Sequence, residues 1–221
     1  MAVLPQALRR AVPPRVRDDV RLRAVAVGAG LIPPRTMHSA EERELLQRLA
    51  RGATRVVEIG VYEGSSAVAL CAVLGPEAEL HLVDPFGHHP TALPAGWGAV
   101  EQASRRVVAR AARRHDGPRV VWHVERSEDT GRGWDAPVDV VFIDGDHAED
   151  ATRLDWELWH RHVVPGGHLL FHDAREGKPG GRGLPGPTRV VDELFRGDQA
   201  LGGWSIAAEV DRTVAVRKNI R

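Results

Sequence analysis

The chain has 221 residues and contains little cysteine, no excess of either charge and few aromatic side chains. Cys71 is the only cysteine, so no internal disulfide framework can form. Its neighbours, AVALCAVL, predict a buried apolar position rather than a nucleophile. The 30 basic residues equal the 30 acidic ones in number. Because nucleic-acid binding needs a basic excess or stripe, we expect no nucleic-acid partner and interpret the arginines of residues 105–114 as a solvated helix face.

Long apolar runs are also missing from the sequence. No stretch approaches the ~20 apolar residues that a membrane-spanning helix needs, and the N-terminus shows no apolar signal-peptide core. We therefore expect a cytoplasmic protein with no membrane partner. Aromatic residues make up 5% of the chain, so the composition shows no obvious stacking platform for a flat polyaromatic substrate.

Strand-like and helix-like segments alternate along most of the chain. Apolar runs predict strands over 54–60, 79–84, 119–124, 138–144, 168–173, 204–210 and 213–218. Amphipathic segments predict helices over 40–50, 65–74, 98–115, 150–163 and 189–196. Ser39 and Glu42 form a capping box at the first of these helices, and Thr188 is a candidate cap for the last. Continuous apolar strands alternating with helices predict a doubly wound parallel α/β sheet, closed at one edge by an antiparallel hairpin.

Residues 1–36 precede this alternation and are rich in proline, arginine and alanine. We expect a short helical extension over 1–36 and one domain over 37–221. A short apolar and arginine-rich segment in front of a domain needs a surface to pack against. The extension is therefore our candidate for a contact in a homodimer.

Glycines and a carboxylate follow the first two predicted strands. In a doubly wound sheet, ligands bind beyond the carboxyl ends of the strands. In VVEIGVYEGSS, Gly60 and Gly64 flank the turn into a helix, where glycine allows a tight turn and the close approach of a ligand. Asp84 ends the second strand, where an acidic side chain can accept hydrogen bonds from the hydroxyls of a ribose. Each feature alone also fits a tight turn or a helix cap, and the pair is more specific than either.

Five segments together resemble a known family: VVEIGVYEGSSAVAL, LVDPFG, VFIDGDH, DWELW and VPGGHLLFHD. They are similar to class I S-adenosylmethionine (SAM)-dependent methyltransferases, within the small-molecule O-methyltransferase group whose fourth strand reads F-I-D-G-D-H. The resemblance covers roughly residues 37–217. It implies a Rossmann-like doubly wound sheet of seven strands in the order 3-2-1-4-5-7-6, with strand 7 antiparallel and helices on both faces.

The resemblance also implies which residues bind SAM. Glu58, Gly60 and Gly64 would line its methionine end. Asp84 would hold the ribose, and Ser127 and Glu128 would lie near the adenine. The full implied set is Glu58, Gly60, Tyr62, Gly64, Ser65, Asp84, Pro85, Phe86, Ser127, Glu128 and Asp144.

Asp144 and Asp173 end the fourth and fifth predicted strands, so their carboxylates are expected side by side at the methyl end of the cofactor. Two like charges repel unless a proton or a cation lies between them. Oxygen ligands of this kind suit Mg²⁺ or another divalent cation. We predict such a site at Asp144 and Asp173, with Asp146 as a further ligand. Related O-methyltransferases use an ion there to lower the pKa of the substrate hydroxyl.

One pair departs from the family pattern, which has an acidic or amide pair after the fifth strand. Here the pair is His172-Asp173, and histidine suits transition metals better than Mg²⁺. A second hypothesis therefore makes His147 or His172 a general base that needs no metal. A third has Asp146 capping the helix that starts near Ala148, with the histidines only shaping the pocket. The candidate catalytic residues are Asp144, His147 and His172.

Several other segments are expected near the pocket. The glycine-rich loop 174–187 predicts either a lid over the substrate or a plain surface loop. Trp156 and Trp159 share a helix face and predict core packing rather than substrate stacking. The remaining candidates for the pocket or its border are His38, His88, His89, Trp97 and Arg175.

The sequence predicts a SAM-dependent methyltransferase that methylates a hydroxyl of a small molecule, such as a secondary metabolite or a sugar, with a divalent cation. One alternative is a metal-independent N- or C-methyltransferase with a histidine base. The other is a non-catalytic protein that binds the cofactor. A pure binder has no need of three aspartates at the methyl end, which argues against the last alternative.

Overall fold

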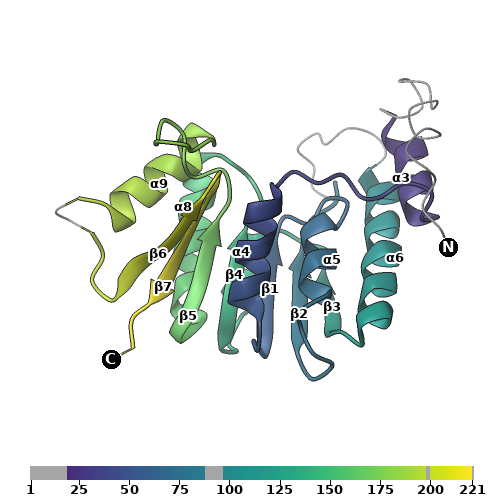
Figure 1. Cartoon of the computed structure of the whole chain (residues 1–221), viewed down its shortest axis with the longest axis horizontal. Helices are drawn as coiled ribbons and strands as arrows, with labels where there is room; N and C mark the ends of the chain where they lie inside the picture. The colour runs from purple at the N-terminus through teal and green to yellow at the C-terminus, as the bar shows by residue number, and fades with distance from the viewer. Residues whose placement is uncertain (1–18, 88–96, 198–199, 221) are drawn as a thin grey trace.

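A computed structural model describes residues 19–87, 97–197 and 200–220, and these contain one seven-stranded sheet (Figure 1). The strands are β1 Arg55–Ile59, β2 Glu79–Val83, β3 Arg119–His123, β4 Val138–Ile143, β5 Val163–Phe171, β6 Trp204–Val210 and β7 Thr213–Lys218. Their order is β3-β2-β1-β4-β5-β7-β6. The first five strands pair in parallel, while β7 is antiparallel to both β5 and β6. The predicted fold class and strand order are confirmed.

Helices cover both faces of this sheet. They are α3 Val20–Gly28, α4 Ala40–Ala50, α5 Ser65–Cys71, α6 Trp97–His115, α7 Ser127–Arg132, α8 Glu149–Trp159, the 3₁₀ turn η1 His160–His162, and α9 Pro185–Phe195. Side chains alternate across each strand, so Val56 packs with α4, α5 and α6, whereas Val57 packs with α8 and α9. Figure 1 shows α4 and α5 in front of the sheet and α8 behind it.

The core contains the apolar residues that the sequence placed there. Cys71, Trp156 and Trp159 are all buried, which confirms the three predictions made for them. Burial also raises the pKa of the Cys71 thiol to about 12, so this cysteine stays protonated and unreactive. Within the described residues, no helix is long and apolar enough to cross a membrane.

Several elements differ from the prediction in their bounds, and one helix was not predicted. β5 starts at Val163, not at residue 168, and includes Pro165, Gly166 and Gly167 beside a register shift in β4. A Cβ on Gly167 would lie 2.8 Å from the carbonyl oxygen of Asp139, so glycine is required for the two strands to approach. α9 starts at Pro185, a favoured first position for proline. α7 was not predicted.

Thr188 lies inside α9 rather than capping it. Its hydroxyl donates to the carbonyl of Leu184 and accepts a hydrogen bond from the backbone N–H of Glu176. The threonine therefore ties the preceding loop to the first turn of the helix.

The described part of the extension packs on the domain. Ala24 and Val27 of α3 are buried in the same apolar cluster as α6, and Nη1 of Arg110 donates to the carbonyl of Gly28 at 2.7 Å. Residues 1–18, His88 and His89 lie outside the described residues, as does the side chain of Trp97. The dimer contact stays a prediction.

Candidate active site

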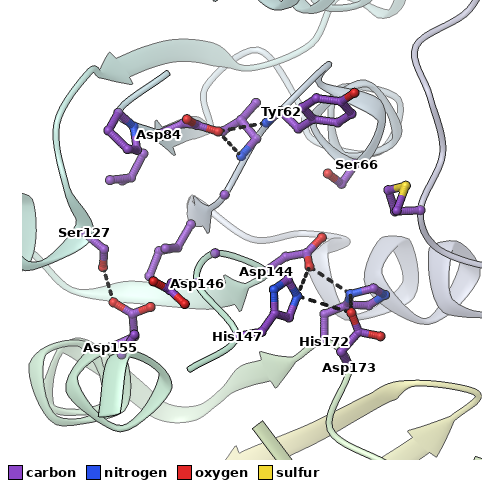
Figure 2. A pocket seen from close by; sticks show the side chains of 18 of the residues that line it. Tyr62, Ser66, Asp84, Ser127, Asp144, Asp146, His147, Asp155, His172 and Asp173 are labelled. Carbon is purple, nitrogen blue, oxygen red and sulfur yellow. Dashed lines mark hydrogen bonds and ion pairs between the residues drawn. The ribbon is translucent and has the colours of Figure 1, made fainter. Parts of the chain in front are cut away.

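A cavity of about 620 Å³ opens beyond the carboxyl ends of β1, β2, β4 and β5 (Figure 2). This volume lies within the roughly 300–1,000 Å³ typical of small-molecule pockets. The sequence-predicted residues that line it are His38, Gly60, Tyr62, Ser65, Asp84, Pro85, Ser127, Glu128, Asp144, Asp146, His147, His172 and Asp173. The structure thus brings most of the predicted site together on one side of the sheet.

Three of the predicted cofactor residues do not line the cavity. Glu58 is fully buried behind Ser66, whose hydroxyl donates to it, and burial raises the pKa of this carboxyl to about 8. Gly64 is the N-cap of α5, with a left-handed φ of 82°. Phe86 is buried in the core against Trp122. These three residues lie behind the residues that line the cavity.

Asp84 holds the turn that follows β1. Its Oδ2 accepts hydrogen bonds from the backbone N–H groups of Val61 and Tyr62, and its Oδ1 accepts one from that of Phe86. Burial raises the pKa of this carboxyl. A carboxylate offers about four acceptor positions, so about one is left for a ligand. The predicted contact with the ribose hydroxyls stays a prediction.

Ser127 starts α7 and is oriented by two side chains of α8. Its hydroxyl donates to Asp155, and it accepts a hydrogen bond from Nε1 of Trp159 at 3.0 Å (Figure 2). Asp155 is buried, and this burial raises its pKa to about 6. Asp155 lines the cavity but was not predicted as a site residue. The available signal was an aspartate next to Trp156 on the buried face of an amphipathic helix.

Asp144, His147, His172 and Asp173 meet at one end of the cavity. One ligand atom from each lies within 4.8 Å of all the others. Nδ1 of His172 is 2.8 Å from Oδ1 of Asp144, and Nε2 of His147 is 3.2 Å from Oδ2 of Asp173. Figure 2 shows these four side chains pointing toward one another from the ends of β4 and β5.

The carboxylates and imidazoles of this cluster shift each other's pKa. Asp144 and Asp173 raise the pKa of His147 to about 9. Burial lowers the pKa of His172, but the neighbouring carboxylates outweigh it and raise this pKa to about 12. Burial alone would raise the pKa of Asp144 and of Asp173, yet both are lowered by the two imidazoles. Near neutral pH both rings are therefore in the positively charged imidazolium form, which cannot accept a further proton as a general base must.

Glu42 and Arg212 surround the cluster from two other elements. Oε1 of the buried Glu42 lies 3.6 Å from Nε2 of His172 and accepts hydrogen bonds from Arg212 N–H and the Thr213 hydroxyl. Nη1 of Arg212 lies 3.1 Å from Oδ1 of Asp173. The predicted capping box at Ser39 and Glu42 is confirmed. The contacts of Glu42 with the β6–β7 turn and with His172 were not predicted, because the spacing of a capping box carries no information about a distant hairpin turn.

Two predicted features lie away from the cluster. Asp146 is exposed and lies apart from it in Figure 2, and its Oδ1 accepts a hydrogen bond from the backbone N–H of Ala148. Asp146 therefore forms a turn before α8, whose N-cap is Ala148. Arg175 does not line the cavity and instead pairs with Glu209.

The loop 174–187 folds back on the β6–β7 turn. Arg182 N–H donates to the carbonyl of Asp211, and Ala174 N–H donates to that of Arg212. No residue of this loop lines the cavity. The alternative of a plain surface loop describes this arrangement better than a lid does.

This chain is similar to a methyltransferase family and to solved structures of O-methyltransferases. A family model described as a methyltransferase domain matches residues 57–174, just over half of the chain. The structure of the O-methyltransferase TomG from Streptomyces achromogenes, solved with SAM, is 20% identical with a TM-score of 0.62, over 92% of this chain and 91% of that one. An O-methyltransferase from Bacillus cereus with S-adenosylhomocysteine is 18% identical with a TM-score of 0.59, over 96% of each chain.

A curated relative is similar over a shorter segment. It is the uncharacterized protein R132 of Acanthamoeba polyphaga mimivirus, 28% identical over 60 residues. The match covers 27% of this chain and about a quarter of the length of that protein.

Proposed function

The chain belongs to the methyltransferase-domain family whose model matches residues 57–174, and from this premise we propose that it transfers a methyl group from SAM to a hydroxyl of a small molecule with the help of a divalent cation. The family match confirms the predicted methyltransferase. A secondary metabolite or a sugar is the proposed acceptor class. Two proteins of similar structure are O-methyltransferases that hold SAM or its product, which supports both the donor and the acceptor group.

The first half of the cavity fits SAM. Asp84 keeps about one acceptor position for a ribose hydroxyl, while its other positions fix the turn that holds Tyr62. Ser127 and Glu128 add polar groups to the wall at the end of β3, where the adenine is expected. A ligand bound along this wall would present its methionine end to the turn at Gly60, next to Asp144.

The observation that carries the proposal is the group of four ligand atoms at that end. The buried Nε2 of His147 and both ring nitrogens of His172 lie 2.8–3.6 Å from carboxylate oxygens without forming well-aligned hydrogen bonds within the described residues. Asp144 and Asp173 would hold a divalent cation, and the imidazoles could join as ligands after losing their protons. Such a cation supplies one effect, a lower pKa of the acceptor hydroxyl.

The chain's own residues supply the geometry of the transfer. The acceptor oxygen must approach the methyl carbon on the side opposite sulfur. Holding the two partners in line accounts for much of the acceleration in such a displacement. Asp144 follows β4 and Asp173 follows β5, two strands that pair in register up to Ile143 and Phe171. The sheet therefore fixes the spacing of the two carboxylates.

The charge balance of the cluster favours a second candidate, a metal-independent N- or C-methyltransferase. Glu42, Asp144 and Asp173 bring three negative charges. The protonated His147 and His172 together with Arg212 bring three positive ones. The carboxylates therefore do not need a cation to be neutralised, and a direct measurement must decide between the two candidates.

The test is calorimetric titration of the purified protein with SAM and, separately, with Mg²⁺ and Mn²⁺ in the absence and presence of EDTA. Asp144→Asn and Asp173→Asn are the test variants. Asp150→Asn is the matched control, because Asp150 is an exposed aspartate in the first turn of α8 that does not line the cavity. Release of S-adenosylhomocysteine is then followed with panels of hydroxyl and amine acceptors.

We expect SAM binding, and cation binding that is lost in both test variants and kept in Asp150→Asn. Activity should require a hydroxyl and stop with EDTA. SAM binding with no cation binding, and activity on amines in EDTA, would favour the second candidate. No SAM binding under any condition would refute both candidates.

A further inference from the structure

His38 is a third histidine of the cavity wall, and neither of the functions proposed above uses it. It lies between α3 and α4, directly before the N-cap Ser39. Its relative exposure is 9%, and it lines the cavity together with Asp144 and His172. The site therefore contains one histidine from the N-terminal half as well as the two that follow β4 and β5.

Both ring nitrogens of His38 are buried and have no hydrogen-bond partner among the described residues. A buried polar group without a partner is costly, and most such groups in folded proteins are paired. At the wall of a cavity, the missing partner can be a bound ligand. This observation points to a polar group of the substrate next to His38.

The charge state of His38 differs from that of the other two histidines. Burial lowers its pKa below the ordinary value of 6.5, and so does the neighbouring His172. Asp144 and Glu42 act in the opposite direction and do not outweigh these effects. A neutral imidazole has one N–H donor and one nitrogen that can accept a proton. At neutral pH, His38 is thus expected to be neutral, whereas His147 and His172 are protonated.

We propose that His38 is a catalytic residue that accepts the proton of the acceptor hydroxyl during methyl transfer. As the O–H bond breaks, its proton moves to a ring nitrogen of His38. The oxygen electron pair forms the new bond to the methyl carbon, and the carbon–sulfur bond breaks with its electron pair on sulfur. The products are the methyl ether, S-adenosylhomocysteine and an imidazolium that returns its proton to water. This inference rests on the proposed function, because it assumes a hydroxyl acceptor.

The activity test compares wild type with His38→Asn and His38→Gln, using a hydroxyl acceptor found in the panel described above. His168→Asn is the matched control. His168 is a partly buried histidine whose pKa is also lowered by burial, but it lies on β5 away from the cavity. General-base catalysis contributes roughly 100-fold or more, so kcat should fall by at least about that factor in both His38 variants. The KM for SAM should change little, and the control should keep its kcat.

The pH profile separates a base from a residue that only fills space. Wild-type kcat should fall on the acidic side of neutrality, where His38 becomes protonated. This acidic limb should be absent in His38→Asn and present in His168→Asn. Asp144, Glu42 and His172 also act on His38, so cation binding is measured by calorimetry at each pH and should be the same in wild type and His38→Asn.

A second measurement does not depend on activity. In ¹⁵N-labelled wild type, the histidine ring signals are recorded against pH, and the His38 signals are assigned as those missing from His38→Asn. We expect a neutral ring at pH 7 that titrates below 6.5. A protonated His38 at pH 7 would overturn the proposal, as would variants that keep wild-type kcat and its acidic limb. If wild type methylates only amines, the proposed function fails, and the ring signals still decide the charge state of His38.

Discussion

Substituting Gly60 by alanine should damage both the stability of the fold and the geometry of the candidate active site. Gly60 has a left-handed φ of 86°. A Cβ there would lie 2.1 Å from the carbonyl oxygen of Asp144 and 2.8 Å from Cα of Gly145. Real Cβ atoms essentially never approach another heavy atom closer than 3.0 Å. The backbone of Asp144 must therefore retreat from β1 by about 1 Å.

The stability that Gly60→Ala is expected to lose has two parts. A non-glycine residue at positive φ costs about 1–2 kcal/mol. The displacement adds to this by weakening the hydrogen bond from Asp144 N–H to the carbonyl of Ile59, which is 2.8 Å long, for a further loss of about 1 kcal/mol. We expect Gly60→Ala to lower the free energy of unfolding by about 2–3 kcal/mol. Because a misplacement of about 1 Å can cost 100-fold in rate, kcat should fall by about that factor.

Gly52→Ala is the matched control. Gly52 also has a left-handed φ, 76°, but nothing lies within 4 Å of a Cβ placed there. It should cost about 1–2 kcal/mol of stability and leave kcat and cation affinity unchanged. Urea unfolding, calorimetry with Mn²⁺ and steady-state kinetics measure the three quantities. If Gly60→Ala matched Gly52→Ala in all three, the close approach of the two strand ends could not be what positions Asp144.

Three further predictions concern buried groups. In Glu58→Gln, the amide mimics the protonated acid. The pKa of Glu58 in the folded protein is about 8, above the ordinary 4.5. The free energy of unfolding of wild type, measured in urea, should therefore fall as the pH rises from 4.5 to 8, and that of the variant should not. The pKa of Glu42 in the folded protein is about 2, below the ordinary 4.5, so its stabilising contribution is present above pH 4.5. The difference in free energy of unfolding between wild type and Glu42→Gln should therefore shrink as the pH falls toward 2. Trp159→Phe removes the donor to Ser127 and should weaken calorimetric SAM affinity by about 1 kcal/mol or roughly fivefold. An unchanged affinity would show that this hydrogen bond does not orient a group that binds the cofactor.

The regular part of the fold could be predicted because its signals are local. Continuous apolar strands and amphipathic helices specify β1 to β4 and the helices α4, α5 and α6 within a few residues. α7 was missed because the six residues SEDTGR include a glycine and have no apolar period. The early start of β5 was missed because Pro165, Gly166 and Gly167 together indicate a turn. Their positions in the strand depend on the neighbouring β4, which a local pattern does not contain.

The chemical site was predicted in its residue types but not in its charge states. The three histidines of the cavity wall are chemically the same side chain, and only their neighbours distinguish them. His147 and His172 face carboxylates from β4, β5 and α4, which keep both rings protonated. The ring nitrogens of His38 are buried without a well-aligned hydrogen bond within the described residues, and burial together with His172 lowers its pKa below the ordinary value. The sequence hypothesis chose a base from the histidines nearest the aspartates, yet proximity to aspartates is the condition that makes a histidine a poor proton acceptor at neutral pH. The best candidate is therefore the histidine that the acidic motif does not include.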